Sequence, residues 1–387
     1  MMRHSLTMPS VQSAIIPVVN EWIRENPGTL SLGQGMVSYP PPASVMQAIQ
    51  HFGTQPTDHY YGSAFGMPTL LNVIDTKLLN ENAIDCQRGY RVMVTAGSNM
   101  GFLNVLLPIV DPGDEVILPL PYYFNQEMAV RMLHCTPIFV PTDGDYQLQI
   151  DLLRAAITTK TRAIVTVSPN NPSGAVYPEV DLRAVNALCQ QHGLYHISDE
   201  AYEYFTYDNA QHFSPGSIAG AGAHTISLYS LSKAYGFASW RMGYLVIPKE
   251  LVPSLMKAQD TNLICPPLIT QHAALAALQT GIAYCKNQLL PLTEVRHYMI
   301  TQLQGLEHVC QTSVTAGAIY FLLKLNTDRN DLEVLHTLIR DFKIAALPGS
   351  AFGLTDGCYL RISYGMLNHA SAEIAMQRLI KGITTLC

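Results

Sequence analysis

The chain has 387 residues, of which 48% are hydrophobic and only 13% are charged, and its formal net charge is −6. Such a chain can bury a large core and is expected to form two domains of unequal size, and the low share of charge favours a large buried subunit interface. There is no evident basic patch for nucleic acid and no apolar run of the roughly 18 residues that a membrane helix needs, so we expect neither partner.

In the first two thirds of the chain, predicted strands alternate with predicted helices, from about residue 69 to residue 247. This alternation is typical of a mostly parallel sheet flanked by helices. The elements that matter most are strand 90–94, helix 100–110, strand 163–167, helix 180–192 and a strand that ends at Asp199.

From about residue 266 the pattern becomes helical and then returns to short strands, which predicts a second, α+β domain. The expected elements are helices 270–280 and 283–303 and strands 318–325 and 358–363.

We therefore predict a large α/β domain over residues 40–275 and a smaller α+β domain formed by residues 1–39 and 276–387. The cleft between them is the expected ligand site.

The eight cysteines show no C-x-x-C spacing, so they are interpreted as reduced thiols of a cytoplasmic protein. One H-x-x-x-H spacing occurs, from His192 to His196, but Gly193 and the change from helix to strand separate the two rings. Because no third ligand stands beside them, we predict no metal.

One motif combines a lysine with a phosphate-binding side chain: Ser230-Leu-Ser-Lys233-Ala-Tyr-Gly-Phe-Ala-Ser-Trp-Arg241. Lysine forms a Schiff base with an aldehyde, and arginine offers a planar charged fork to phosphate oxygens. Pyridoxal phosphate presents both groups. Alone, the motif could equally be a polar turn, so its companions decide the interpretation.

The first companion is Asp199, which is expected at the carboxyl end of a parallel strand, where open α/β sheets bind ligands. A buried carboxylate there can pair with a pyridinium nitrogen and keep it protonated. In isolation, an aspartate at a strand end is more often a helix cap.

Two further segments complete the set. The loop that contains Asn171 follows strand 163–167, and Asn171 and Tyr202 could both donate hydrogen bonds to the cofactor's phenolic oxygen. The stretch Gly97-Ser98-Asn99 lies between a predicted strand and a predicted helix, where backbone amides form an anion site.

Together these residues resemble the fold-type I pyridoxal phosphate enzymes, specifically the class I and II aminotransferases, from about Leu30 to Tyr364. The resemblance implies that Lys233 is the Schiff-base lysine and base, that Asp199 is the pyridinium partner, and that Asn171 and Tyr202 hydrogen-bond the phenolic oxygen. It implies a phosphate site made of Gly97, Ser98, Asn99, Ser230 and Arg241.

The same resemblance assigns Tyr123 to the cofactor ring, Arg361 to the substrate α-carboxylate, and Gly35, Tyr39 and Asn171 to substrate contacts. Tyr61 matches a tyrosine that reaches the neighbouring subunit's phosphate, so a homodimer with composite sites is expected. Cis peptide bonds are expected before Pro121 and Pro172.

These expectations describe an aminotransferase that moves the amino group of an amino acid to a 2-oxo acid by ping-pong kinetics. Neither residues 260–281 nor residues 31–50 contain Arg or Lys, so an aromatic amino acid or methionine is favoured over aspartate. Short motifs also look most like plant and cyanobacterial aminotransferases for such substrates.

Three alternatives stay open: an aspartate or broad-specificity aminotransferase, a carbon–sulfur β-lyase with the same lysine and aspartate, and a non-catalytic regulator. A regulator would not need all of the site residues intact.

Overall fold

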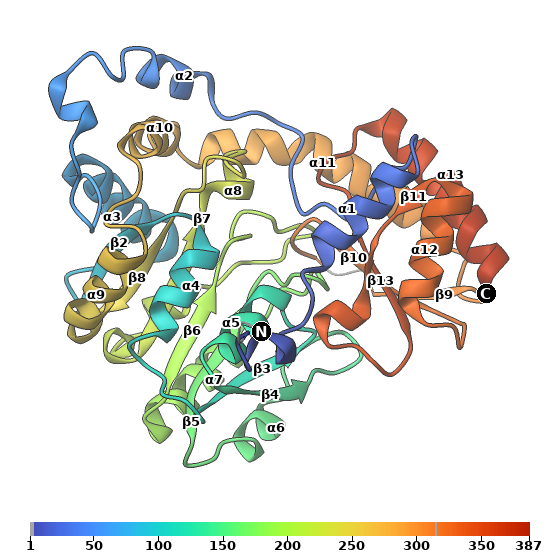
Figure 1. Cartoon of the computed structure of the whole chain (residues 1–387), viewed down its shortest axis with the longest axis horizontal. Coiled ribbons are helices and arrows are strands. Elements are labelled where there is room, and N and C mark those ends of the chain that lie inside the picture. Colours follow the sequence, from blue (N-terminus) through green and yellow to red (C-terminus); the bar gives the residue numbers. More distant parts are fainter. Residues whose placement is uncertain (1–3, 314–315) are drawn as a thin grey trace.

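The computed structural model describes residues 4–313 and 316–387. Its main feature is a large twisted sheet with helices on both faces, next to a smaller group of strands and helices (Figure 1). In the described part of the chain the large sheet has seven strands: β2 (Tyr90–Thr95), β3 (Glu115–Leu120), β4 (Thr136–Pro141), β5 (Thr161–Val167), β6 (Tyr195–Asp199), β7 (Thr225–Ser230) and β8 (Gly243–Pro248).

The strand order is β2-β8-β7-β6-β5-β3-β4. All neighbouring strands are parallel except β8, which runs antiparallel to both β2 and β7. The carboxyl ends of β2, β3, β5, β6 and β7 therefore lie at one edge of the sheet, together with the start of β8. Open α/β sheets bind their ligands at this edge.

The central strands are largely buried and mostly apolar because both faces of the sheet are covered. Alternate residues of β5 pack into different cores: Ala163 and Val165 join the larger cluster, whereas Ile164 joins a second one with Leu182 and Val185 of a helix. This is the two-residue period of a strand. The helices of this part are α3 (Pro68–Asn82), α4 (Ser98–Leu106), α5 (Phe124–Met132), α6 (Ile150–Ala155), α7 (Glu179–His192), α8 (Leu231–Ala234), α9 (Val252–Asn262) and α10 (Leu268–Leu278).

The second group is built on an antiparallel sheet of order β12-β13-β10-β9 and is drawn in orange and red in Figure 1. The N-terminal segment joins it, because β1 (Leu30–Ser31) pairs with β11 (Ile344–Ala345). The remaining elements are α1 (Ile15–Glu25), α2 (Ala43–Ile49), β9 (Cys310–Thr312), β10 (Tyr320–Leu325), α11 (Ile282–Leu303), α12 (Asp331–Phe342), β12 (Leu347–Pro348), β13 (Cys358–Ser363) and α13 (His369–Leu386).

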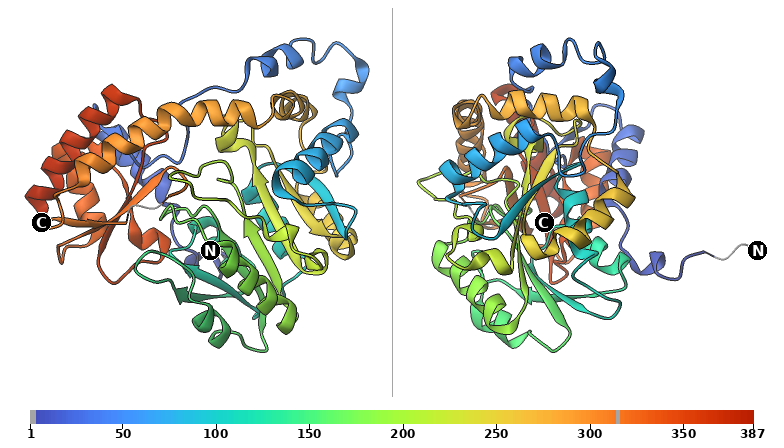
Figure 2. Two further views of the ribbon diagram at one scale, coloured as in Figure 1. Left: turned by 180° about the vertical axis from the view of Figure 1, so that it is seen from behind. Right: turned by 90° about the vertical axis from the view of Figure 1, so that its left-hand side faces the viewer.

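The long helix α11 runs from α10 toward the second group, and α2 packs against α10 (Figure 2). The predicted α/β fold, with a mostly parallel central sheet, is confirmed. The domain boundaries near residues 40 and 275 stay a prediction, which the pairing of β1 with β11 supports.

Some predicted element ends were wrong by a few residues. Helix α4 begins at Ser98 and ends at Leu106, short of residue 110, and strand β10 begins at Tyr320 rather than at residue 318. Residues 107–109 form turns directly after α4, which end the helix there. Ala318 has φ +56, which is not an extended backbone angle, so the strand begins only after it. Hydrophobic periodicity does not register these local changes in backbone angle.

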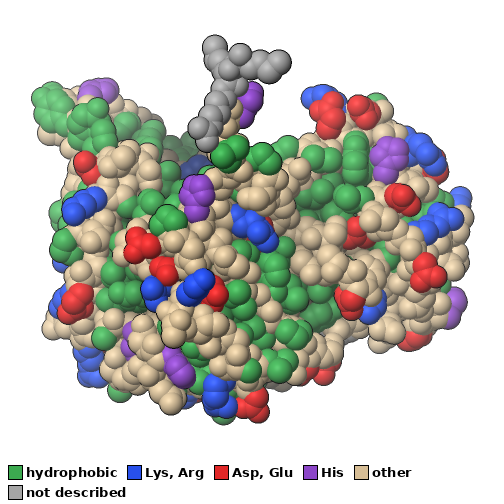
Figure 3. All heavy atoms as spheres, turned by 60° about the horizontal axis from the view of Figure 1, so that its bottom comes forward, with side chains coloured by type: hydrophobic (Ala, Val, Ile, Leu, Met, Phe, Trp, Pro, Cys, Tyr) green, Lys and Arg blue, Asp and Glu red, His purple; other side chains and the backbone are tan. Residues whose placement is uncertain are grey.

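All eight cysteines are free thiols. Positive and negative side chains are interspersed on the face shown in Figure 3. None of the helices in residues 4–313 and 316–387 combines the length and the apolar character needed to cross a membrane.

Candidate active site

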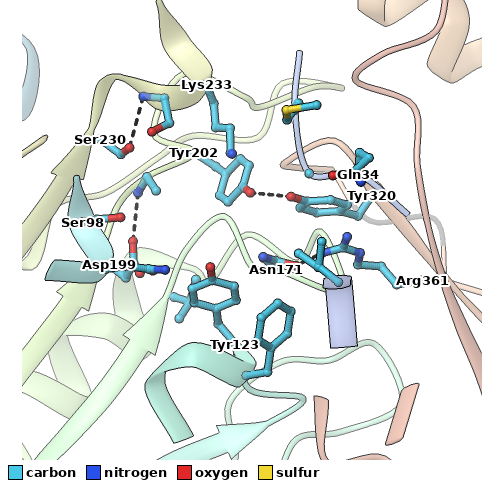
Figure 4. A pocket seen from close by; sticks show the side chains of 18 of the residues that line it. Gln34, Ser98, Tyr123, Asn171, Asp199, Tyr202, Ser230, Lys233, Tyr320 and Arg361 are labelled. Atoms are coloured by element: carbon cyan, nitrogen blue, oxygen red, sulfur yellow. Dashed lines mark hydrogen bonds between the residues drawn. The ribbon is translucent and has the colours of Figure 1, made fainter. Parts of the chain in front are cut away.

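A cavity of about 240 Å³ lies between the carboxyl edge of the large sheet and the second sheet (Figure 4). Most of the residues singled out from the sequence line it. They are Gly35, Ser98, Asn99, Tyr123, Asn171, Asp199, Tyr202, Ser230, Lys233, Arg241 and Arg361.

The topology explains why these distant residues meet. Ser98, Asn171 and Asp199 follow or end strands β2, β5 and β6, and Ser230 ends β7, so all four lie at the same edge of the sheet. Arg361 comes from β13 and closes the cavity from the second sheet.

Lys233 is held by the short helix α8. The Ser230 hydroxyl caps this helix by accepting a hydrogen bond from the Ser232 amide at 3.1 Å, and Tyr39 donates to the Lys233 carbonyl at 2.7 Å. Loss of water around the amine, together with the charges of Arg241 and Arg361, lowers the Lys233 pKa to about 8. Roughly a tenth of the amine is therefore neutral at pH 7, which supplies the form that a nucleophile or base requires.

Asp199 lies at the floor of the cavity and is 6% exposed. One carboxylate oxygen accepts from the Ala201 amide at 3.2 Å and the other from Gln126 Nε2 at 2.9 Å. Because both donors are neutral, burial dominates and raises the pKa of Asp199 to about 6. The segment that follows, residues 200–204, forms turns, so the structure does not support the helix-cap interpretation.

Ser98, Ser230 and Arg241 all line the cavity, and Ser98 and Ser230 lie on the same side of it (Figure 4). Gly97 lies beside them and is required there, since it has φ +82 and a Cβ atom would lie 2.4 Å from a guanidinium nitrogen of Arg241. Hydroxyls, a helix N-terminus and a guanidinium together make a suitable site for a phosphate.

Arg361 is 2% exposed and is held in place by two hydrogen bonds. It donates from Nη1 to Asn171 Oδ1 at 2.9 Å and from Nη2 to the Gly33 carbonyl at 2.5 Å. Among the described residues, its buried Nε has no hydrogen-bond partner. Because Asn171 uses its carbonyl for Arg361, its amide hydrogens are left to donate elsewhere.

Three predicted residues, Gly97, Tyr39 and Tyr61, are not among those that line the cavity, and Gly97 directly precedes the lining residue Ser98. Tyr39 supports the backbone of Lys233, as described above, rather than lining the cavity. Tyr61 is 80% exposed and does not line the cavity of its own chain. The predicted cis bonds before Pro121 and Pro172 are present, and the bond before Pro169 is also cis, which was not predicted.

The sequence interpretation missed several residues of the site. Gln126 contacts Asp199, Tyr320 contacts Tyr202, and Ile16 and Phe124 add apolar surface to the cavity. The position of Gln126, three residues after Tyr123 in the first turn of α5, offered a signal, but nothing near Tyr320 in the sequence marks it as a site residue.

The chain matches the family Aminotransferase class I and II over residues 27–379, which is most of its length. It belongs to this family. Among relatives, the Arabidopsis thaliana protein named aromatic aminotransferase ISS1 is 32% identical over 383 residues, which cover 96% of this chain and 94% of that protein. An aspartate aminotransferase of Pyrococcus abyssi is 31% identical, with 91% of both chains covered.

Solved aminotransferase structures have the same fold as this chain. A single mutant of Thermus thermophilus aspartate aminotransferase superimposes with a TM-score of 0.90 at 27% identity, covering 99% of this chain and 100% of the other. The predicted fold-type I architecture and aminotransferase activity are thus confirmed, and the cofactor of such enzymes is pyridoxal phosphate.

The site fits pyridoxal phosphate on its own chemistry. A lysine with a lowered pKa can hold the aldehyde, a buried carboxylate without a cationic hydrogen-bond donor can take the ring nitrogen, and the cradle at Gly97 can take the phosphate. These three groups lie in one cavity (Figure 4).

Proposed function

We propose that this aminotransferase prefers an aromatic amino acid or methionine as its amino donor. One observation carries the proposal: among the described residues that line the cavity, the cations are Lys233, Arg241 and Arg361. Each already has a use, at the aldehyde, the phosphate and the α-carboxylate respectively. No lining cation remains for the distal carboxylate of aspartate.

The rest of the lining favours an apolar side chain. Ile16 from α1, Met36 from the segment after β1, and Phe124 at the start of α5 all face the cavity. An apolar wall can bury a phenyl ring or a thioether, whereas an unpaired carboxylate buried there costs several kcal/mol. The curated relatives include both aromatic and aspartate aminotransferases, so they do not separate the two preferences.

The proposed roles use residues that the cavity brings together. Arg361 would bind the α-carboxylate and fix the donor, and the neutral amine of Lys233 would take the proton from Cα and hold it for return. The bound cofactor supplies an electron sink for the charge that develops at Cα. Asp199 keeps the ring nitrogen protonated, while Asn171 and Tyr202 donate to the phenolic oxygen.

The biological unit in this proposal is a homodimer in which Tyr61 serves the neighbouring subunit's phosphate. The exposure of Tyr61 and its neighbour Tyr60, at 80% and 65%, supports this arrangement, since both rings are available for contact with another chain. A cytoplasmic location also remains a prediction, consistent with eight free thiols.

The donor preference is tested by measuring kcat/KM for phenylalanine, tyrosine, tryptophan, methionine and aspartate with one fixed 2-oxo acid. We expect the best apolar donor to exceed aspartate by at least roughly a hundredfold, because each 1.4 kcal/mol corresponds to about a factor of ten. Aspartate equal to or above the others would show that a distal cation reaches the site, for example from a second subunit.

A further inference from the structure

Tyr320 connects the two sides of the cavity. It is the first residue of β10, is 1% exposed, and its hydroxyl oxygen lies 2.5 Å from that of Tyr202 (Figure 4). Tyr202 follows β6 of the large sheet, whereas Tyr320 belongs to the second sheet. The two rings meet edge to face, with centroids 5.6 Å apart. One hydrogen bond thus joins a site residue of each sheet.

The direction of the Tyr320 hydroxyl is fixed by its surroundings. In the pairing of β10 with β13, Tyr320 lies opposite Ser363 and Leu322 lies opposite Arg361, so Tyr320 and Arg361 are diagonal neighbours on one face. The Arg361 guanidinium lies 4.3 Å from the Tyr320 ring centroid. A Cβ atom at Gly35 would lie 2.5 Å from the hydroxyl, so the glycine leaves the hydroxyl room to reach Tyr202.

The number of hydrogens decides the direction of the bond. Each tyrosine hydroxyl donates one hydrogen and accepts at its oxygen, and burial raises the pKa of both, so both stay protonated. If Tyr202 gives its only hydrogen to the cofactor's phenolic oxygen, Tyr320 must supply the hydrogen between the two tyrosines. The order is then Tyr320 to Tyr202 to the phenolic oxygen.

We propose that Tyr320 is a positioning residue: its hydroxyl donates to Tyr202, aims the Tyr202 hydrogen at the phenolic oxygen, and strengthens that second hydrogen bond. The proposal rests on the role proposed above for Tyr202. A hydroxyl that accepts a hydrogen bond is a better donor, and the nearby Arg361 charge polarises Tyr320 in the same sense. Both effects favour the ionised phenolic oxygen and lower the pKa of the bound cofactor.

The test is a pH titration of the visible absorbance of the substrate-free holoenzyme. Wild type is compared with Tyr202→Phe, Tyr320→Phe and the double variant. We expect Tyr202→Phe to raise the pKa of the bound cofactor by about one unit, because it removes the hydrogen bond to the phenolic oxygen. We expect Tyr320→Phe to raise this pKa by about half a unit, because it removes only the hydrogen bond that strengthens the first one. The double variant should match Tyr202→Phe, because Tyr320 acts only through Tyr202.

Tyr364→Phe is the matched control. Its hydroxyl is also buried, but it donates to the Ala318 carbonyl at 3.0 Å and does not line the cavity, so the titration should stay at the wild-type value. Thermal midpoints and cofactor content of the Tyr320→Phe and Tyr364→Phe proteins show whether a shift merely reflects damaged folding.

The outcomes are distinct. An unchanged titration in Tyr202→Phe overturns the role proposed for Tyr202 itself. A shift in Tyr202→Phe with none in Tyr320→Phe overturns the inference about Tyr320 alone, and a raised KM in that case would assign its hydroxyl to the substrate carboxylate. A double variant that shifts beyond Tyr202→Phe also overturns it, because Tyr320 would then act on the cofactor by another route.

Discussion

Asp199 is held at the cavity floor at a cost in stability. Its pKa in the folded, cofactor-free protein is raised from 3.8 to about 6 by burial. For a group with a raised folded-state pKa, the stabilising contribution is complete below the unfolded value and is lost as the pH rises through the folded value. Above pH 6 the ionised carboxylate therefore destabilises the cofactor-free protein, until a protonated ring nitrogen is placed beside it.

This predicts opposite effects of Asp199→Asn on stability and on catalysis. At pH 7.5 the cofactor-free variant should unfold at a temperature a few degrees above wild type, and the difference should shrink when both are measured near pH 4. The holoenzyme should lose at least about a hundredfold in kcat, because an amide cannot keep the ring nitrogen protonated. Differential scanning calorimetry at two pH values and steady-state kinetics give the two readouts.

Near-normal turnover of Asp199→Asn would remove Asp199 from the catalytic site. A lower unfolding temperature at pH 7.5 would instead show that its hydrogen bonds with Gln126 and Ala201 outweigh the burial cost.

At the scale of elements, the junction between β2 and α4 depends on Gly97. Its φ of +82 disfavours any other residue, and an added Cβ would lie 2.4 Å from the Arg241 guanidinium. We expect Gly97→Ala to weaken cofactor binding at least about tenfold, because the added Cβ strains the backbone and displaces Arg241 from the proposed phosphate site. Titration of the cofactor-free protein with pyridoxal phosphate measures the change.

Gly113→Ala is the matched control for this junction. Gly113 also has a positive φ, of +93, but no atom of the described part of the chain lies within 4 Å of its would-be Cβ. It should lose stability by a similar amount while keeping wild-type cofactor affinity. Equal affinities in both variants would mean that Arg241 does not hold the phosphate.

The parts of the site that follow strand ends were predictable from the sequence. Asp199 ends β6, and Asn171 and Gly97 lie within four residues of the ends of β5 and β2, so the parallel topology gathers these positions at one edge. Tyr320 was not predictable in this way, because its place depends on the register of β10 against β13 and on the docking of the second sheet. Local patterns carry no information on that register.

A similar limit explains the missed apolar wall. Ile16 lies in an amphipathic helix whose sequence predicts a buried face without showing what it faces. Only the docking of α1 places this side chain in the cavity, more than two hundred residues before Lys233 in the chain.

At the scale of the whole molecule, one chain supplies the lysine, the ring partner and both arginines of the cavity, but not Tyr61. If Tyr61 serves the neighbouring subunit, every site needs two chains, although each chain contributes Lys233 to only one site. A Tyr61→Ala protein should then bind cofactor roughly ten- to a hundredfold more weakly, from loss of a hydrogen bond to a charged phosphate.

Mixing two defective proteins tests this arrangement. Lys233→Ala subunits have no reactive amine but an intact Tyr61, and Tyr61→Ala subunits have the reverse defect. In a mixed dimer, the site that contains Lys233 receives Tyr61 from the other chain and is fully wild type. After subunit exchange at equal amounts, about half of the dimers are mixed and each has one intact site, so activity at limiting cofactor should reach about a quarter of the wild-type value. Activity no higher than that of the Tyr61→Ala protein at the same dilution would place Tyr61 in its own chain's site, or outside the site altogether, and the composite dimer would be wrong.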